Sequence, residues 1–322
     1  MKPFLILSIC SFLSVCAASA QDFEYSFAQT YKVSAPATLD LSTSDGHIDI
    51  IPSSGDEIKV FYIVRRVGKL VKTDLKKLEE DFIVEIESSS KGVKINVKDK
   101  RQYKPFSFEH SLAVGFKAYV PKETMCHLIT SDGDIAITGL NGDQHLRTSD
   151  GSIELADIAG SISGKTSDGD VRIRKIKGNV EVQTSDGTIN LESIGGDVVA
   201  STSDGNIRLN RVRGDIAVKT SDGYIDFKEI SGSFKASTSD GNIRGSVVEL
   251  RKELTLRTSD GDIDVTLPDQ LGMDLDIKAE SIDVPFKNFT GKFDKTFVRG
   301  QSNGGGIPVV LTTSGGSVRL AH

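Results

Sequence analysis

Residues 169–186 read GDVRIRKIKGNVEVQTSD, and this 18-residue unit recurs along the chain with few changes. From Asp132 to Asp240 the units follow one another at a spacing of 18 residues for six steps, and the next step is 20. A fixed period of this length is typical of a solenoid, in which each repeat stacks on the one before it. The string Thr-Ser-Asp-Gly links the units nine times, with aspartates at Asp45, Asp132, Asp150, Asp168, Asp186, Asp204, Asp222, Asp240 and Asp260.

Each unit contains two short segments in which apolar and polar residues alternate. In the quoted unit, Val171 and Ile173 form the first apolar pair, and Val180 and Val182 form the second. Alternation at period two indicates a strand with one buried face. Between the segments the chain must turn, and we expect the glycines there to adopt a positive φ. The predicted structural turn residues are Asp186, Gly187, Gly178, Gly196 and Gly214.

Stacking the units places like residues over like residues in columns. One inward column has Ile or Val in every coil, at Ile135, Ile153, Val171, Ile189, Ile207, Ile225, Ile243 and Ile263. The outward column one residue further on alternates in charge over much of its length, as at Arg208, Asp226 and Arg244. We therefore predict an all-β fold, a parallel β-solenoid (single-stranded β-helix) of 18-residue coils with irregular capping strands at both ends. An antiparallel array of hairpins is the alternative, but it would not require successive coils to match in register.

The sequence pattern divides the chain into four parts. Residues 1–20 have the positive head, the apolar run and the small-residue cleavage pattern of a signal peptide. Residues 21–125 contain longer strand patterns and a helix candidate at residues 73–80 with Thr73 as its N-cap; we interpret them as wider, irregular coils that cap the solenoid. The regular repeats occupy residues 126–261, and residues 262–322 form the C-terminal cap. In the 20-residue coil Lys252 replaces the corner glycine, which predicts a local bulge.

Composition narrows the possible partners and the location. The chain has 39 basic and 45 acidic residues, a formal net charge of −6, and 7% aromatic residues. This balance argues against a nucleic-acid partner. Cleavage after Ala20 would leave Cys126 as the single cysteine, so no disulfide could form within the chain. No later segment approaches transmembrane length, and we expect an exported protein of the periplasm, the outer surface or the extracellular space.

The repeats resemble a known family of bacterial proteins. The Thr-Ser-Asp-Gly-x-Ile pattern follows a strand-rich segment that ends in Tyr-Val-Pro-Lys at residues 119–122. In this combination the chain is similar to the bacterial "putative adhesin" family of β-strand-repeat domains of unknown function, and to the related autotransporter-adhesin head domain called GIN. The resemblance covers roughly residues 35–320. It implies an adhesin-like role, and the family has no agreed catalytic or ligand residues to carry over.

The column of aspartates is the most conspicuous candidate site. In a parallel stack the carboxylates would lie ~4.8 Å apart. We expect each of them to cap its own turn by accepting backbone N–H bonds, so that we predict no metal ion. The alternative is calcium, because the repeat-in-toxin β-roll also has an 18-residue coil, but that roll requires Gly-Gly-x-Gly-x-Asp at both turns. A calcium ladder would use Asp132, Asp150, Asp168, Asp186, Asp204, Asp222 and Asp240.

Catalytic and sugar-stacking patterns are weak. The histidines at positions 47, 110, 127, 145 and 322 show no metal-ligand spacing and no nucleophile partner. Cys126 is expected to be a small buried apolar residue. Tyr224 is the one aromatic residue that points outward from the regular coils. Tyr103, Phe106 and Phe108, beside Lys100, Arg101 and Lys104, form either a contact patch or an apolar loop packed over the end of the solenoid.

These observations predict an exported, non-catalytic, adhesin-like surface or envelope scaffold for macromolecular contact, with no catalytic residue and no cofactor. Its partner would be an envelope protein or a polysaccharide. One alternative is a periplasmic sensor or accessory protein that binds an envelope ligand. The other is a carbohydrate-active enzyme on a β-helix, which would need two close carboxylates with raised pKa values in a cleft.

Overall fold

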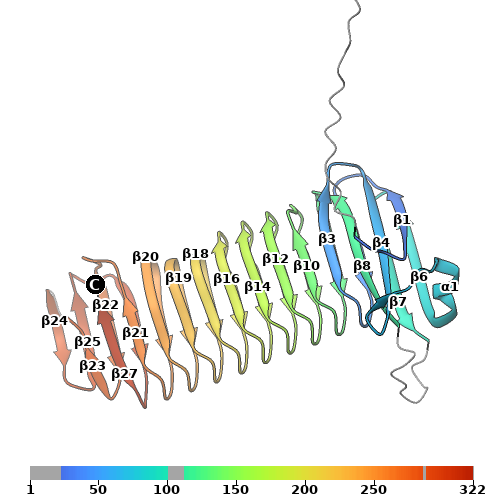
Figure 1. Ribbon diagram of the computed structural model, residues 1–322. Helices are drawn as coiled ribbons and strands as arrows, with labels where there is room; N and C mark the ends of the chain where they lie inside the picture. The colour runs from blue at the N-terminus through green and yellow to red at the C-terminus, as the bar shows by residue number, and fades with distance from the viewer. Residues whose placement is uncertain (1–22, 101–111, 286–287, 322) are drawn as a thin grey trace, which may run out of the picture.

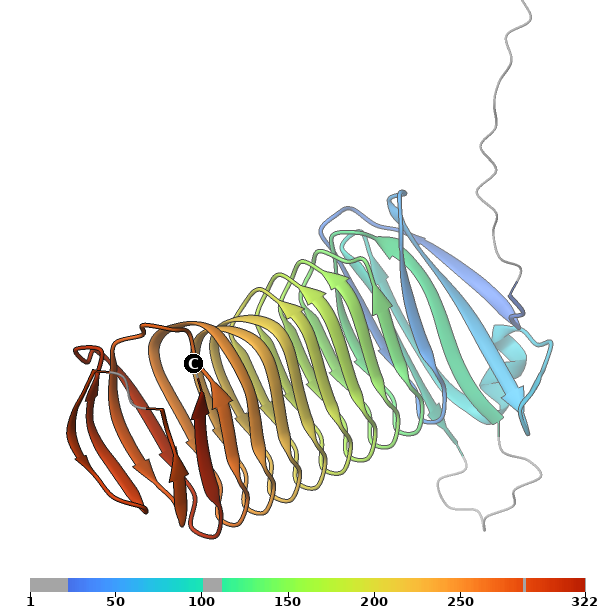
Figure 2. The same ribbon diagram turned by 60° about the vertical axis from the view of Figure 1, so that its left-hand side comes forward.

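The computed structural model describes residues 23–100, 112–285 and 288–321. It is an elongated stack of coils with strands on two sides and one short helix at the N-terminal end (Figures 1 and 2). Each regular coil contributes a strand to a first face, turns, contributes a strand to a second face, and turns again at Thr-Ser-Asp-Gly. The predicted all-β solenoid is confirmed. The predicted leader at residues 1–20 lies outside the described residues, as do Tyr103, Phe106 and Phe108.

Successive strands of the regular coils lie alternately on the second and the first face. On the first face lie β10 (Ile135–Thr138), β12 (Ile153–Ile158), β14 (Val171–Ile176) and β16 (Ile189–Ile194). On the second face lie β9 (Thr124–Ile129), β11 (Gln144–Arg147), β13 (Ile162–Lys165), β15 (Val180–Gln183) and β17 (Val198–Ser201). The next three strands bend from the first face onto the second without a break: β18 (Ile207–Lys219), β19 (Ile225–Ser237) and β20 (Ile243–Arg257).

Strand pairing in this stack is parallel and in register. Val171 pairs with Ile153 on one side and with Ile189 on the other, and the column continues through Ile207 to Ile225. The antiparallel hairpin alternative is therefore wrong. Irregularity is confined to the pairing of β19 with β20, where the register shifts between Phe227 and Phe234. This is the bulge that the 20-residue coil predicted.

The core is a set of continuous apolar columns between the two faces. Every Ile or Val of the first inward column is fully buried, and the residues across from it are buried as well. Phe227, which is larger than its column neighbours, has Gly245 next to it, and a Cβ on that glycine would lie 2.7 Å from the phenyl ring. Large and small residues thus compensate between adjacent coils.

The N-terminal cap has antiparallel strand pairs at its outer end and parallel pairs next to the regular coils. Its elements are β1 (Phe27–Lys32), β2 (Ala37–Ser42), β3 (Ile48–Ser53), β4 (Glu57–Arg66), β5 (Lys69–Leu70), α1 (Leu75–Asp81), β6 (Phe82–Ser89), β7 (Gly92–Asp99) and β8 (Leu112–Pro121). The helix begins later than predicted, because the Asp74 carboxylate, and not Thr73, accepts the N–H of Lys77 at 2.9 Å. Aspartate is among the preferred N-cap residues.

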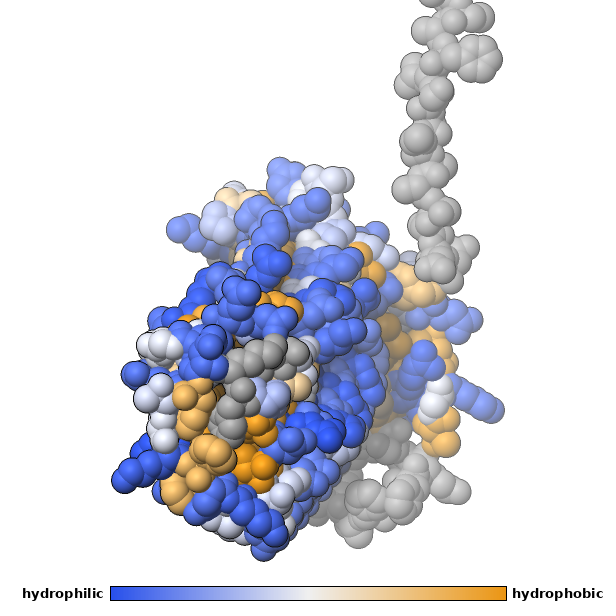
Figure 3. Space-filling model, turned by 90° about the vertical axis from the view of Figure 1, so that its left-hand side faces the viewer, coloured by the Kyte–Doolittle hydropathy of each residue, from blue (hydrophilic) through white to orange (hydrophobic). Residues whose placement is uncertain are grey.

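The C-terminal cap ends with an antiparallel hairpin on the second face. Its strands are β21 (Ile263–Thr266), β22 (Met273–Lys278), β23 (Ser281–Asp283), β24 (Phe289–Phe293), β25 (Phe297–Ser302), β26 (Ile307–Thr312) and β27 (Ser317–Ala321). Seen from this end, apolar residues lie at the surface among hydrophilic ones (Figure 3). Phe293 is 61% exposed and Phe297 is 38% exposed.

Both terminal coils are inserted between coils that are distant in sequence. β3 pairs in parallel with β8 on one side and with β10 on the other, and Figure 1 shows the blue strand between the two green ones. At the other end, β26 lies between β20 and β22, and β27 lies between β21 and β23. Thr313 therefore stacks directly on the Thr258 corner, and its hydroxyl donates to the carbonyl of Gly261 at 2.8 Å.

The described residues contain no helix with the length and apolar character that a membrane span requires.

Candidate functional site

The Thr-Ser-Asp-Gly corner is held by its threonine. Thr184 is buried, and its Oγ1 lies 2.9 Å from the carbonyl oxygen of Ser167 and 3.1 Å from that of Gly169, both in the preceding coil. The same oxygen accepts the N–H of Gly187 at 3.3 Å. Equivalent bonds occur at Thr148, Thr166, Thr202, Thr220, Thr238 and Thr258. The hydroxyl thus closes its own turn and joins it to the coil below.

The aspartates of this corner do not cap it. Their backbone N–H groups donate to the preceding coil, as Asp186 does to the Ser167 carbonyl at 3.0 Å. Their side chains are exposed, and within the described part of the chain the carboxylates from Asp132 to Asp240 accept no hydrogen bond. The predicted capping role of Asp186 is therefore wrong, because the inward-pointing threonine already satisfies the glycine N–H. Residues 23–100, 112–285 and 288–321 also contain no group of three or more His, Cys, Asp or Glu side chains that could hold a metal ion.

The corner glycines are required for close approach and not, in most coils, for a positive φ. A Cβ on Gly187 would lie 2.0 Å from the Gly169 carbonyl oxygen, and one on Gly196 would lie 2.5 Å from that of Gly178. Among the predicted residues only Gly214 has a positive φ, of 148°. The left-handed positions are instead the non-glycine residues Asp157, Lys175, Ser193, Arg211 and Glu229, with φ between 54° and 58°. They turn the chain so that the next apolar residue points inward.

A second ladder of polar side chains follows the corner glycine. Asp170 Oδ1 accepts the N–H of Thr188 in the next coil at 2.8 Å, and Asn206 Oδ1 accepts that of Tyr224 at 3.0 Å. From Asp134 to Asn242 such bonds occur at every second coil, and at the C-terminal end Asp262, in the very next coil, accepts the N–H of Ser317 as well. Sequence reasoning missed this function, although the alternation at intervals of 36 residues is visible in the repeat.

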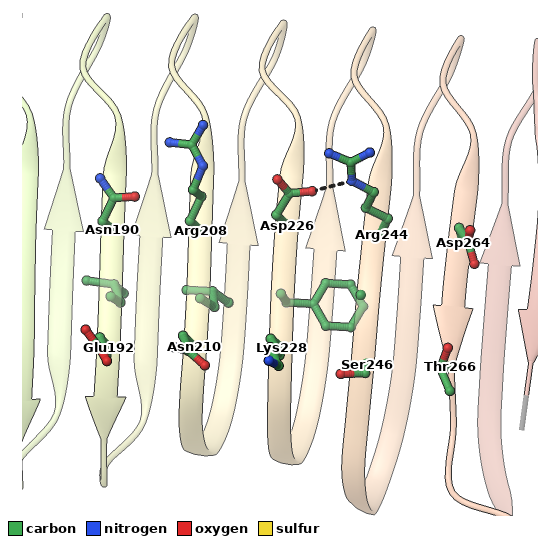
Figure 4. A pocket seen from close by; sticks show the side chains of 14 residues that line it. Asn190, Glu192, Arg208, Asn210, Asp226, Lys228, Arg244, Ser246, Asp264 and Thr266 are labelled. Atoms are coloured by element: carbon green, nitrogen blue, oxygen red, sulfur yellow. Dashed lines mark hydrogen bonds and ion pairs between the residues drawn. The ribbon is translucent and has the colours of Figure 1, made fainter.

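A groove of about 650 Å³ runs across the outer surface of the first face, over β16, β18, β19, β20 and β21. Figure 4 shows its labelled side chains in two columns, one residue from each coil in each column. The first column is Asn190, Arg208, Asp226, Arg244 and Asp264, and the second is Glu192, Asn210, Lys228, Ser246 and Thr266. Successive coils lie ~4.8 Å apart, so the groove presents amide, carboxylate, guanidinium and hydroxyl groups at a regular spacing.

Two of the three carboxylates in the groove lining are paired with arginines, and the third, Asp264, forms no ion pair within the described residues. Arg244 Nε donates to Asp226 Oδ1 at 2.8 Å, and this bond raises the pKa of the guanidinium above its usual value. Glu192 accepts a hydrogen bond from Arg211 at the rim. Asp226 and Glu192 are therefore engaged with cations and are poorly placed to act as a general acid and base. The outward charge column predicted from the sequence is confirmed, and its opposite charges meet where Asp226 lies beside Arg244.

Two further groups make the groove floor polar. Asn210 Oδ1 is buried beneath the groove surface and has no hydrogen-bond partner among the described residues. Arg208 bonds the Tyr224 hydroxyl, and its guanidinium lies 5.0 Å from the centre of the Tyr224 ring. Tyr224 is only partly exposed, so the one outward aromatic residue of the regular coils is covered by an arginine.

The remaining candidates do not form a site. Cys126 is fully buried, and burial raises the pKa of its thiol far above its usual range, as expected of a small core residue. The 18-residue separation of His127 and His145 places their rings in neighbouring coils, with centroids 4.8 Å apart, and His127 Nδ1 lies 2.9 Å from Asp40. His47 lies 3.3 Å from Asp134. His110 and His322 lie outside the described residues.

A family model and two solved structures match the chain. A family model described as Toastrack DUF4097 matches residues 36–228 and, in a second overlapping match, residues 178–320. No curated protein matches the chain. A crystal structure of a "putative adhesin" from Bacteroides fragilis is 16% identical, with 74% of this chain and 96% of that chain covered and a TM-score of 0.40. One of a "putative cell adhesion protein" from Clostridium sporogenes is 12% identical, with 92% and 98% covered and a TM-score of 0.20.

Proposed function

The chain belongs to the Toastrack DUF4097 family, and from this premise we propose that it is a non-catalytic, adhesin-like scaffold that binds an extended envelope macromolecule along its first face. The observation that carries the proposal is the groove over β16 to β21. Its polar groups repeat with the coil spacing over β16, β18, β19, β20 and β21. A partner with its own linear repeat, a polysaccharide or an extended polypeptide, fits such an array.

Rigidity favours binding over catalysis. Each groove side chain stands on a strand that is hydrogen-bonded on both sides, so the columns keep their spacing without the cost of ordering a loop. Because Asp226 and Glu192 are paired with arginines, Asp264 is the one carboxylate of the groove lining without an ion pair among the described residues, whereas acid–base catalysis of this kind uses two. The carboxyl of Asp45 does have a raised pKa, from burial first and then from the charges of Asp132 and Asp99. It lies at the exposed Thr-Ser-Asp-Gly corner, away from the groove.

Export is the second half of the proposal. The leader pattern of residues 1–20 and the resemblance of the repeats to bacterial putative adhesins support a location in the periplasm, at the outer surface or outside the cell. A scaffold stiff enough to project its faces would serve such a location. Fractionation of cells, followed by protease treatment of intact cells, measures this directly. Protein found only in the cytoplasm would contradict it.

The binding experiment compares two arginines on the same face. Arg208 lines the groove, whereas Arg174 is exposed in the second outward column but lies outside the groove. We expect Arg208→Ser to weaken binding to isolated envelope polysaccharide or protein fractions at least about fivefold, and Arg174→Ser to change it little. Binding is measured by biolayer interferometry with the purified chain immobilised.

Three results would contradict the proposal or choose an alternative. Equal binding by both variants and the unchanged chain would show that the groove is not the contact surface. Progressive shortening of the polysaccharide would identify the β-helix enzyme alternative. Binding of a small soluble envelope ligand, with no binding of any polymer, would favour the periplasmic sensor or accessory protein.

A further inference from the structure

One outward column on the second face contains no acidic residue. It is formed by the last outward residue of each strand, and the strand register connects its members coil by coil. Eight steps between coils give it a length of ~38 Å. We call it the basic column, and in spatial order it consists of Arg147, Lys165, Gln183, Ser201, Lys219, Ser237, Arg257, Thr312 and Lys278.

The cations of the basic column have no partners. All five are exposed, and within residues 23–100, 112–285 and 288–321 none of them takes part in an ion pair. Other cations of the solenoid are paired, such as Arg244 with Asp226 on the first face and Lys235 with Glu253 at 2.8 Å on the second. In a chain with more acidic than basic residues, an acid-free line of this length has a charge complementary to an extended anion.

A groove beside the middle of the column adds neutral contacts. It has a volume of about 370 Å³, and its lining contains Lys219, Lys235 and Arg257 but no Asp or Glu. Three hydroxyl residues line it as well, Ser201, Ser237 and Thr255. Val199 is 53% exposed there. Hydroxyl groups can bond the hydroxyls of a sugar, and the valine can contact its C–H surface.

Neighbouring acids confine the anion to the column and do not neutralise it. The Thr-Ser-Asp-Gly aspartates lie around the corner, separated from the basic column by the threonine and serine positions. None of these aspartates forms an ion pair with the basic column within the described residues, and salt at ~0.15 M screens charges over ~8 Å. In the basic column and the outward column beside it, Glu181 is the one acidic residue between β11 and β20, and it lies outside the groove. Asp215 and Glu253, nearer the start of the second-face strands, are each held by a lysine, Asp215 by Lys252 at 2.6 Å and Glu253 by Lys235 at 2.8 Å.

We propose that the basic column binds a linear polysaccharide that carries carboxylate groups, laid along the axis of the solenoid. Cations at Lys219, Arg257 and Lys278 stand at every second coil, ~9.6 Å apart, which is about the length of a disaccharide. The neutral residues between them match the uncharged parts of such a polymer. A nucleic acid fits less well, because neither the basic column nor the groove lining offers an aromatic side chain for base stacking. This surface is distinct from the first-face groove.

The test uses a matched pair of double variants in the purified full chain. Lys219→Gln with Arg257→Gln removes two charges from the basic column. Arg174→Gln with Lys177→Gln removes two exposed charges elsewhere and serves as the control. The probes are polygalacturonate, neutral dextran and an oligothymidylate of similar length, measured by affinity electrophoresis at two salt concentrations. Circular dichroism melts establish that both variants are folded.

We expect the unchanged chain to bind polygalacturonate, more weakly at higher salt, and not to bind dextran. The basic-column variant should lose at least about fivefold in affinity, or ~1 kcal/mol, and the control less than about twofold. Equal losses in both variants, or no binding of polygalacturonate, would overturn the proposal. Tighter binding of oligothymidylate through the same residues would assign the column to nucleic acid instead. If Arg208→Ser alone abolished binding of polygalacturonate, the polymer would lie in the first-face groove, and the basic column would be refuted while the proposed function stood.

Discussion

Replacing Thr184 with Val removes the hydroxyl that closes one Thr-Ser-Asp-Gly corner. Valine has nearly the shape of threonine, so the substitution leaves no cavity and isolates the hydrogen bonds. The N–H of Gly187 loses its acceptor, and the carbonyl of Gly169 in the preceding coil loses its donor. Thr184 is 2% exposed, so water cannot easily replace the missing groups.

The size of the effect follows from the burial of these groups. A buried donor or acceptor left without its partner costs ~1–3 kcal/mol of folding free energy. For a chain of 322 residues the entropy of unfolding near the melting temperature is about 0.7 kcal/mol/K. We therefore expect Thr184→Val to lower the melting temperature by about 1.5–4.5 °C.

Asp186→Asn is the matched control, two residues away in the same corner. Its carboxylate is exposed and accepts no hydrogen bond within the described part of the chain, so the change should cost less than ~0.5 kcal/mol, or under about 1 °C. Differential scanning calorimetry and urea unfolding measure both variants. A loss for Asp186→Asn as large as that for Thr184→Val would refute the argument, because it would mean that the aspartate caps the turn.

Three further outcomes are expected. Gly196→Ala should strongly lower the melting temperature, since its Cβ would lie 2.5 Å from a carbonyl oxygen. Gly195→Ala is the control and should be tolerated, because no heavy atom lies closer than 3.6 Å to its Cβ. Similar melting temperatures for the two variants would show that the corner is not tightly packed. Asp45→Asn should raise the melting temperature at pH 7, because the raised pKa of the folded carboxyl means that its ionised form opposes folding. This gain should vanish below pH ~3.9, the pKa of the carboxyl in the unfolded chain, where the group is protonated in both states. A gain that persists at pH 3 would speak against that cause. In the chain from Gln21 onward, Cys126 should react with a thiol reagent only after unfolding, and reaction in native buffer would show that the N-terminal cap opens.

The period and the polarity of the repeat could be determined from the sequence alone. When every coil repeats Val171, Ile173 and Ile176 at the same places, only a parallel stack in register buries all of them together. A slip of one residue would turn each apolar side chain to solvent. The outward columns follow from the same register, so the residues of the first-face groove and of the basic column can be predicted as positions 18 residues apart. The ion pairs that these residues form cannot be predicted from the sequence.

The roles of the glycine, threonine and aspartate in each corner could not be predicted from the sequence in the same way. Glycine is suited both to a positive φ and to close backbone contact, and the repeat does not distinguish these reasons. Gly187 turned out to need the second, and Lys175 took the left-handed conformation without being glycine. Likewise, Thr184 and Asp186 are both capable of capping a turn. The path of the chain decides which of them points inward.

The order of the terminal coils was decided by the tertiary structure. Asp45 lies 87 residues before Asp132, yet its coil stacks directly on the first regular coil. At the other end, the last coil of the chain places β26 between β20 and β22, which both precede it in the sequence. Inside the solenoid, the next coil in sequence is also the next in space, so the local repeat determines position. At the ends several segments with similar strand patterns compete for the same exposed rung. That competition is settled by which pairing buries the most apolar surface and leaves the fewest open backbone hydrogen bonds, and both quantities depend on contacts between residues far apart in the chain.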